Sequence, residues 1–339
     1  MLWLWIVLAT AAASAVIGYY FSNLIIHIRT IPYEQTLQKE AEAGRVDPDN
    51  FERMPKQKVW IDSPFGYSLH AYWIPSACQD SKKVMIFVHG VTHSLIGSVK
   101  YLPIFQKRGY HAFIYDHRRH GRSGGTTTTF GYMEKHDLKA CVDWVQNQLG
   151  ADAFIGIHGE SMGAATALQH AAIDGRAAFY IADCPYSDLT DQLAHRLKED
   201  YRLPKLPLLH LANAFTRLRA KFWFSDVSPI RDIAHIHTPV LFVHGEEDRY
   251  VPTHMSLEMY EIKPGMKQLY LVPEAAHAQA ITVDPAAYEA TVAKFLDGVE
   301  SMQEWATDHS RLNAAKQDGS KTGEKHDKNH FTTTVQPLQ

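Results

Sequence analysis

Three side chains that lie far apart in the sequence have the types and positions needed for nucleophilic catalysis. Ser161 is the central residue of the pentapeptide GESMG (159–163), between an apolar run that predicts a strand and an alanine-rich run that predicts a helix. Asp248 and His277 each follow another apolar run by a few residues. A serine hydroxyl is a weak nucleophile unless a base takes its proton, and the base needs an acid to orient it. The pattern therefore predicts Ser161 as nucleophile, His277 as base and Asp248 as acid.

The pentapeptide also predicts a particular turn. Glycines at positions 159 and 163 allow a strand and a helix to approach closely at a tight junction. Such a junction raises the hydroxyl of Ser161 above the sheet. It also places the serine at a helix N-terminus, where free N–H groups can hold an anion.

Other side chains compete for these roles. Asp183 ends the strand that follows the pentapeptide and is an alternative acid. Glu246 and Glu247 are neighbours of Asp248 that we expect to face solvent, and His254, at the start of a helix, is an alternative base. Glu160 is either structural or contacts the leaving group.

Strand-like and helix-like runs alternate from about residue 56 to about residue 298. Eight strands are predicted, at Val59–Asp62, Ser68–Ile74, Val84–His89, His111–Asp116, Ala153–His158, Ala178–Asp183, Val240–His244 and Gln268–Val272. Helical patterns lie between most of them, at Val99–Lys107, Met133–Leu149, Ser161–Ala172, His254–Tyr260 and Pro285–Leu296. No helix separates the first two strands, so they predict a hairpin, and the others predict a parallel sheet with both faces covered. The loops that carry the three side chains leave the carboxyl ends of parallel strands, the edge at which open α/β sheets have their active sites.

Four motifs, in order and with matching spacing, resemble the α/β-hydrolase superfamily over about residues 56–298. They are Val88-His89-Gly90, the segment DHRRHGRS (116–123), the pentapeptide around Ser161, and the loop from Gly245 to Pro252. Bacterial prolyl-oligopeptidase-like or serine-aminopeptidase-like membrane-anchored hydrolases are the most similar subgroup. The resemblance implies an α/β fold with a mostly parallel eight-stranded sheet, helices on both faces, and a helical lid after strand six at about 185–232. The chain order Ser161, Asp248, His277 is that of the superfamily.

The same resemblance implies a mechanism. The backbone N–H groups of Val91 and Met162 would hold the developing oxyanion, with Thr92 as the alternative donor if the turn is set one residue later. The expected reaction is hydrolysis of a carboxylic ester through an acyl-enzyme, without a metal or an organic cofactor. A peptidase or amidase with the same triad, and a non-catalytic binding protein with this fold, are the alternatives.

Composition excludes several other classes of function. A net charge of -3 and a pI near 6.7 give no basis for a nucleic-acid partner. Three cysteines are too few for a disulfide framework and fit a reducing compartment. The 20 histidines include no metal-binding spacing, so pairs such as His235 with His237 and His117 with His120 are interpreted as structural or surface residues.

The N-terminal segment predicts a membrane anchor. Residues 1–26 carry no charged side chain, and a helix of this length would span a hydrocarbon core of about 30 Å. The alternative is a cleaved signal peptide with Ala11-Ala12-Ala13 as processing site, but the n-region lacks Lys and Arg. Basic residues follow the segment, beginning at Arg29, so the catalytic domain is expected in the cytoplasm.

The expected organisation is an anchor at 1–26, a linker or surface-packed leader at 27–55, a hydrolase domain at 56–300 and a disordered tail at 301–339.

The expected lid has an unusual charge pattern. Between residues 202 and 221 it carries five basic side chains and no acidic one, interleaved with leucines. Such a segment predicts a helical cover over the pocket, and its basic and aromatic character also fits contact with an anionic membrane surface. A small-molecule or lipid ester is the expected substrate, and the membrane is the expected partner of the N-terminal helix.

Overall fold

The computed structural model describes residues 1–303 of the 339-residue chain. It divides into two compact units, Met1–Val292 and Ala293–Gln339. The sheet, its covering helices and the candidate site all belong to the first unit. In the second unit residues 293–303 are helical, and the tail predicted to be disordered lies outside the described residues from position 304 onward.

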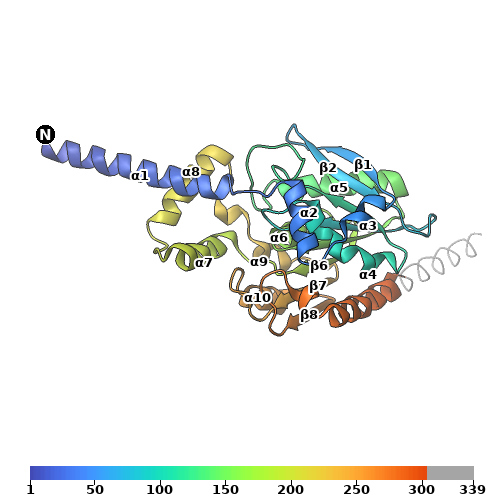
Figure 1. The fold of residues 1–339 in the computed structure, drawn as a ribbon. Coiled ribbons are helices and arrows are strands. Elements are labelled where there is room, and N and C mark those ends of the chain that lie inside the picture. The colour runs from blue at the N-terminus through green and yellow to red at the C-terminus, as the bar shows by residue number, and fades with distance from the viewer. Residues whose placement is uncertain (304–339) are drawn as a thin grey trace, which may run out of the picture. The chain divides into compact units, whose positions relative to one another are not determined.

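An eight-stranded sheet forms the centre of the first unit (Figure 1). The strands are β1 Gln57–Asp62, β2 Ser68–Ile74, β3 Lys83–Val88, β4 His111–Tyr115, β5 Phe154–Glu160, β6 Ala177–Asp183, β7 Val240–Gly245 and β8 Lys267–Val272. Their order across the sheet is β1-β2-β4-β3-β5-β6-β7-β8. β1 pairs antiparallel with β2, with Val59 opposite Ala71, and β2 pairs antiparallel with β4. The pairs from β4 to β8 are parallel, so the mostly parallel sheet with an N-terminal hairpin is confirmed.

Helices precede the sheet, connect its strands and form the insertion between β6 and β7. They are α1 Leu2–Ile26, α2 Tyr33–Glu42, α3 Pro48–Arg53, η1 Leu95–Tyr101, α4 Leu102–Gln106, α5 Glu134–Leu149, α6 Met162–Ala171, α7 Leu189–Tyr201, α8 Leu208–Ala220, η2 Phe224–Asp226, α9 Pro229–Ile233, α10 His254–Ile262 and α11 Ala280–Val283. Successive side chains of β3 point to opposite faces, and both sets are buried. Ile86 belongs to the apolar cluster that includes Leu138 of α5, whereas the ring of Phe87 lies 5.5 Å from that of Phe105 in α4. Both faces of the sheet are therefore covered.

One predicted helix differs in form. The segment predicted as a single helix at Val99–Lys107 consists of the 3₁₀ helix η1 followed by the short helix α4. Pro103 lies in the first turn of α4, where its missing N–H is tolerated, but it cannot continue an α-helical ladder from the preceding turn. The proline therefore divides the segment.

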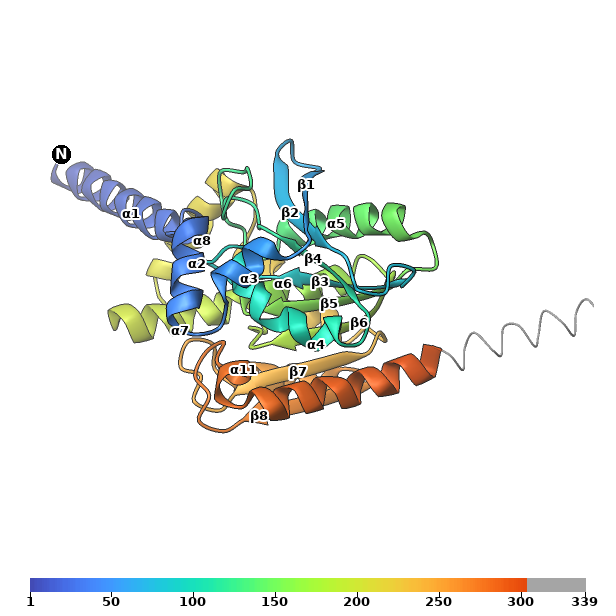
Figure 2. The same cartoon turned by 45° about the vertical axis from the view of Figure 1, so that its right-hand side comes forward.

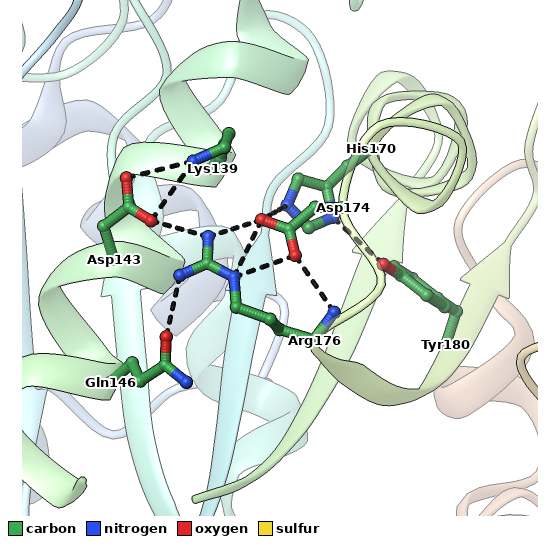
Figure 3. A network of polar contacts seen from close by, with 7 residues as sticks. All are labelled: Lys139, Asp143, Gln146, His170, Asp174, Arg176 and Tyr180. Carbon is green, nitrogen blue, oxygen red and sulfur yellow. Dashed lines mark hydrogen bonds and ion pairs between the residues drawn. The ribbon is translucent and has the colours of Figure 1, made fainter. Parts of the chain in front are cut away.

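A polar network fixes the C-terminal end of α6 (Figure 3). The guanidinium of Arg176 contacts Asp174 and also Asp143 and Gln146 of α5. His170, in the last turn of α6, lies 3.0 Å from the hydroxyl of Tyr180 in β6. The network therefore joins α5, α6 and β6 at the opposite end of α6 from Ser161.

The insertion between β6 and β7 contains α7, α8, η2 and α9, in the range where the sequence predicts a helical lid. Helix α8 lies alongside the C-terminal part of α1 in both views (Figure 1, Figure 2). Gly18, Ser22 and Ile26 are the buried residues of α1, spaced four apart on one face. A Cβ at Gly18 would collide with the ring of Phe215, so glycine is what allows the two helices this spacing. Helix α1 is long and apolar enough, by length and composition, to cross a membrane.

The segment between α1 and the sheet contains α2 and α3. The Phe51 side chain of α3 is buried, and Arg45 pairs with the buried carboxylate of Glu40 at 2.7 Å. The N–H of Ile31 donates to the carbonyl of Thr92 at 2.7 Å. Residues 27–55 therefore pack on the domain and hydrogen-bond to the loop after β3.

The junction of β5 and α6 brings three backbone segments into contact. A Cβ at Gly159 would collide with the carbonyl of Gly163, and a Cβ at Gly163 would collide with the carbonyl oxygen of Val88 in β3. Ser161 lies between them with φ of 55°. The N–H of Ser161 donates to the carbonyl of Asp183 at 2.8 Å, which fixes the turn to β6. Close approach of backbone atoms, rather than side-chain packing, sets the position of Ser161.

We expect Gly163→Ala to lower the free energy of unfolding by about 3 kcal/mol or more, because backbone atoms cannot move aside as a flexible side chain can. Gly175→Ala is the matched control, since a Cβ there meets no atom within 4 Å. Urea unfolding of both variants measures the difference. Equal stabilities for the two variants would contradict this account of the turn.

Candidate active site

Ser161, His277 and Asp248 form a continuous hydrogen-bonded chain. The Nε2 atom of His277 lies 2.8 Å from the hydroxyl oxygen of Ser161, and its Nδ1 atom lies 2.6 Å from Oδ2 of Asp248. Because Nδ1 faces a carboxylate, it carries the proton, and Nε2 is left to accept a hydrogen bond from the serine hydroxyl. The structure thus brings together three residues from the loops after β5, β7 and β8.

The carboxylate of Asp248 is held in its ionised form. Burial alone would raise its pKa, but hydrogen bonds from His244 and His277, the charge of His277 and the N–H of Val251 outweigh burial and hold the pKa well below its usual range. Its Oδ1 atom accepts the N–H groups of Tyr250 and Val251 at 2.9 and 2.8 Å. The acid is therefore charged and fixed in orientation.

The competing residues lie elsewhere. Asp183 is buried, and its Oδ2 accepts a hydrogen bond from the hydroxyl of Tyr288 at 3.1 Å and lies 3.3 Å from the hydroxyl oxygen of Tyr101. Glu246 and Glu247 are exposed, and His254 is exposed at the first position of α10.

A buried ion pair lies directly beside Ser161. Lys100 Nζ is 2.6 Å from Oε2 of Glu160, and both side chains are only 6% exposed. The hydroxyl of Tyr101 donates to the same oxygen at 2.7 Å. Burial alone would raise the pKa of Glu160, but the charge and hydrogen bond of Lys100 and the hydrogen bond of Tyr101 lower it to about 2. Glu160 is thus a buried anion with its partners already in place.

The neighbouring carboxyl of Asp183 behaves in the opposite way. Burial and then the charge of Glu160 raise its pKa to about 6, and the charge of Lys100 and the hydrogen bond of Tyr288 offset this only in part. One nearby ammonium cannot stabilise both carboxyl groups as anions. Lys100 pairs with Glu160, so Asp183 is the group with the higher proton affinity.

Three buried histidines support the turn after β3. The Nδ1–H of His89 donates to the carbonyl of Gly90 at 2.7 Å, and the Nε2–H of His117 donates to the carbonyl of His89 at 3.1 Å. The Nδ1 of His120 donates to the carbonyl of Arg118, which leaves its Nε2 to accept the N–H of Thr92 at 3.2 Å. Burial lowers the pKa of all three rings, so they are neutral and serve as donors and acceptors for the backbone.

An apolar cavity of about 300 Å³ opens onto Ser161. Val91 and Met162 line it beside the serine, and most of the remaining wall comes from α1, α7, α8 and the loop after β7, with Phe130 and Tyr186 from two further loops. The ring of Tyr250 is part of this wall and lies 4.9 Å from the ring of His277. Charged side chains contribute little to the lining, with only Arg29, Arg196 and Asp200 among the residues that form it.

One group of potential metal ligands occurs in residues 1–303, formed by Cys184, Asp248 and His277. Asp248 and His277 already share a proton, and burial, followed by the charges of nearby carboxylates, raises the pKa of the Cys184 thiol well above its usual value. A protonated thiol is a poor ligand. The protonated thiol and the hydrogen bond between Asp248 and His277 therefore do not favour a metal site at this group.

Sequence reasoning missed several residues of the site. Lys100 and Tyr101 belong to a segment with no motif of its own, and the cavity residues of α1 lie in a segment assigned wholly to the membrane. No local signal pairs Lys100 with Glu160. The apolar residues that follow Gly18 in α1 could have been singled out only by knowing what packs against them.

Comparison with known proteins places the chain among hydrolases. A family model described as X-Pro dipeptidyl-peptidase (S15 family) matches residues 26–220. The uncharacterized protein YqkD of Bacillus subtilis (strain 168) is 41% identical over 299 residues, which cover 87% of this chain and 97% of YqkD. The lysophosphatidylserine lipase ABHD12 of Danio rerio is 24% identical over 255 residues, covering 70% of this chain and 65% of ABHD12.

The fold has close counterparts among solved structures. The Pyrococcus furiosus esterase Pf2001 superposes with a TM-score of 0.59 and 26% identity, covering 74% of this chain and 94% of the esterase. The predicted α/β-hydrolase fold is thereby confirmed.

The ion pair beside Ser161 makes a testable contribution to stability. We expect Lys100→Met to lower the free energy of unfolding by about 3–5 kcal/mol, because it leaves Glu160 as an unpaired buried charge. The double variant Lys100→Met with Glu160→Gln should regain most of this loss, because no charge then remains unpaired. Urea unfolding at neutral pH measures both. A double variant no more stable than Lys100→Met would refute the explanation.

The free energy of unfolding of the same proteins, measured as the pH is lowered, shows whether ionised Glu160 stabilises the fold. The folded pKa of Glu160 lies below its ordinary value of 4.5, so ionised Glu160 stabilises the fold above pH 4.5 and this contribution falls as the pH falls towards 2. The double variant should lack that part of the acid dependence.

Proposed function

Because the chain belongs to the X-Pro dipeptidyl-peptidase (S15) family of the α/β-hydrolase superfamily, we propose that it is a serine hydrolase that cleaves a carboxylic ester. The chain of hydrogen bonds from Asp248 through His277 to Ser161, at an apolar cavity, is the observation that carries the proposal. In this role Ser161 is the nucleophile, His277 the general base and Asp248 the orienting acid.

The reaction follows from the proton positions. The Ser161 oxygen attacks the acyl carbon as its proton passes to Nε2 of His277, and the ionised carboxylate of Asp248 stabilises the imidazolium that forms. Collapse of the tetrahedral intermediate breaks the ester bond, and the leaving alcohol takes the proton from His277. Water, deprotonated by the same nitrogen, then releases the acid and restores Ser161.

The oxyanion is held by the N–H groups of Val91 and Met162 in this mechanism. Both residues line the cavity beside Ser161, and Met162 is the first residue of α6, where helix N–H groups have no partner within the helix. Thr92, the alternative donor, directs its N–H to His120 instead. That bond favours Val91 over Thr92.

An acyl ester suits the cavity better than a peptide. Recognition of a peptide N-terminus calls for a free carboxylate, whereas Glu160 is paired with Lys100 and Asp200 contacts Arg196. The mostly apolar lining instead suits an alkyl chain. The names of the relatives, an esterase and a lysophosphatidylserine lipase, point the same way. A peptidase or amidase is the second candidate, supported by the description of the family model.

The triad is tested by substitution. We expect Ser161→Ala and His277→Ala each to abolish hydrolysis of p-nitrophenyl esters, and their combination to be little worse, because the two residues act as a unit. Asp248→Asn should reduce kcat by about 10⁴-fold, since an amide favours the wrong tautomer of the histidine. Asp183→Asn is the matched control and should retain far more activity than Asp248→Asn.

A fluorophosphonate probe provides the second readout, with labelling that disappears in Ser161→Ala. Parallel assays with aminoacyl amides separate an esterase from a peptidase. Labelling that survives in Ser161→Ala, or a greater loss in Asp183→Asn than in Asp248→Asn, would overturn the assignment. A folded protein that neither reacts with the probe nor hydrolyses any ester or amide would be a binding protein instead.

The N-terminal helix is proposed to be a permanent anchor with the catalytic domain in the cytoplasm. Its support is structural, because Ser22 and Asn23 accept hydrogen bonds from Arg219 of α8 at 2.8 and 2.9 Å. Removal of the helix would leave these contacts unmade. We expect the membrane-extracted protein to retain residues 1–26, as measured by its intact mass. A mature N-terminus near residue 14, or a C-terminal reporter active only after export, would contradict the proposal.

A further inference from the structure

The C-terminal third of the N-terminal helix forms part of the cavity that contains Ser161. Phe21, Leu24 and Ile25 of α1, and Ile28 just after it, line this cavity together with residues of α7 and α8. The helix therefore contributes to the substrate pocket as well as to the membrane segment.

The docking of α1 on α8 is specific in its geometry. Gly18 meets Phe215, where any larger residue would collide. The guanidinium of Arg219 lies 4.2 Å from the ring centroid of Tyr19 and donates to Ser22 and Asn23. These contacts fix the rotation of α1 about its own axis and its position along α8. The same apolar side chains of α1 therefore face the cavity.

Helix length places this contact at the membrane surface. Residues 2–17 are largely exposed and make a helix of about 24 Å, at about 1.5 Å per residue. For the anchor proposed above, a hydrocarbon core about 30 Å thick extends over the part of α1 that contacts α8. Tyr19 and Tyr20, both exposed, then lie at the interface, as aromatic side chains of membrane helices commonly do.

Exposed lining residues of α1 and α7 indicate that the cavity opens to the surface between these helices. Leu24 and Tyr201, both in the lining, are 37% and 48% exposed. The ring of Phe21 lies 6.1 Å from that of Tyr201, so the two helices are in contact beside this opening. An acyl chain leaving the bilayer at the interface would therefore meet the opening directly.

We infer that the pocket takes the acyl chain of a membrane lipid ester and that α1 is the wall against which this chain lies. The inference rests on the proposed ester hydrolysis at Ser161. It adds the class of substrate and the residues that determine which acyl-chain lengths the pocket accepts. Because α1 continues from the bilayer to the pocket, a lipid substrate can move from the bilayer into the pocket along this helix.

The test replaces one wall residue of the full-length protein by a larger one. Ile25→Trp fills space that the distal methylenes of a long chain would occupy, and each buried methylene is worth about fourfold in affinity. The ratio of kcat/KM for p-nitrophenyl dodecanoate to that for p-nitrophenyl butanoate, in detergent micelles, should fall by about tenfold or more. Val16→Trp is the matched control, because Val16 is 69% exposed on the same helix and lies outside the cavity lining.

Each outcome has a distinct meaning. A ratio that falls in Ile25→Trp and not in Val16→Trp supports the inference that the acyl chain lies against α1. Equal ratios in both variants, with hydrolysis still dependent on Ser161, would overturn the inference and leave the proposed function intact. Loss of hydrolysis and probe labelling in the unmodified protein would overturn the proposed function itself. If Ile25→Trp does not fold, Ile28→Trp tests the same wall, with the same fall in ratio expected.

Discussion

The contact of three backbone segments at Ser161 is the constraint on which the rest of the site depends. Helix α6 approaches β3 and β5 so closely that Gly159 and Gly163 leave no room for a Cβ. This approach holds Ser161 at a positive φ and places the N-terminus of α6 beside its hydroxyl. His277 reaches that hydroxyl because its loop leaves the same edge of the sheet. A shift of α6 by the width of one methyl group would disturb all of these relations together.

Environment, rather than residue type, distinguishes the acidic groups around the serine. Asp248 accepts several N–H groups and remains a charged acceptor for His277. Glu160 is also held as an anion, but its carboxylate is already bound by Lys100 and Tyr101. Asp183 is buried near that anion, and its pKa rises to about 6. Of these three carboxyl groups, only Asp248 combines a stable charge with contact to the histidine.

The insertion after β6 connects this chemistry to the N-terminal helix. Helix α7 is bonded to the loop of Asp248, since Gln192 and His195 donate to the carbonyls of Tyr250 and Arg249 at 2.8 and 2.9 Å. Helix α8 is bonded to α1 through Arg219. The segment before β1 adds a further link, because Ile31 donates to the carbonyl of Thr92. The N-terminal helix, the insertion and the loops of the candidate site are thus parts of one hydrogen-bonded assembly.

Local patterns in the sequence were enough to determine the sheet, the turn at Ser161 and the order of the three catalytic candidates. Strand alternation and flanking glycines are local signals, and parallel strands necessarily bring their carboxyl ends to one edge, which is why Asp248 and His277 could be placed near Ser161 in advance. The 3₁₀ form of residues 95–101 was not predicted, because an apolar helical pattern does not distinguish the two helix types.

Only the tertiary structure decided which side chains from distant segments meet. The pairing of Lys100 with Glu160, the supporting histidines under the loop after β3, and the docking of Gly18 on Phe215 depend on how elements pack. Long-range contacts of this kind leave no periodicity in the chain. The sequence by itself therefore determined which chemistry is proposed for Ser161, and the packing of α1 against the insertion decided the shape of the cavity beside it.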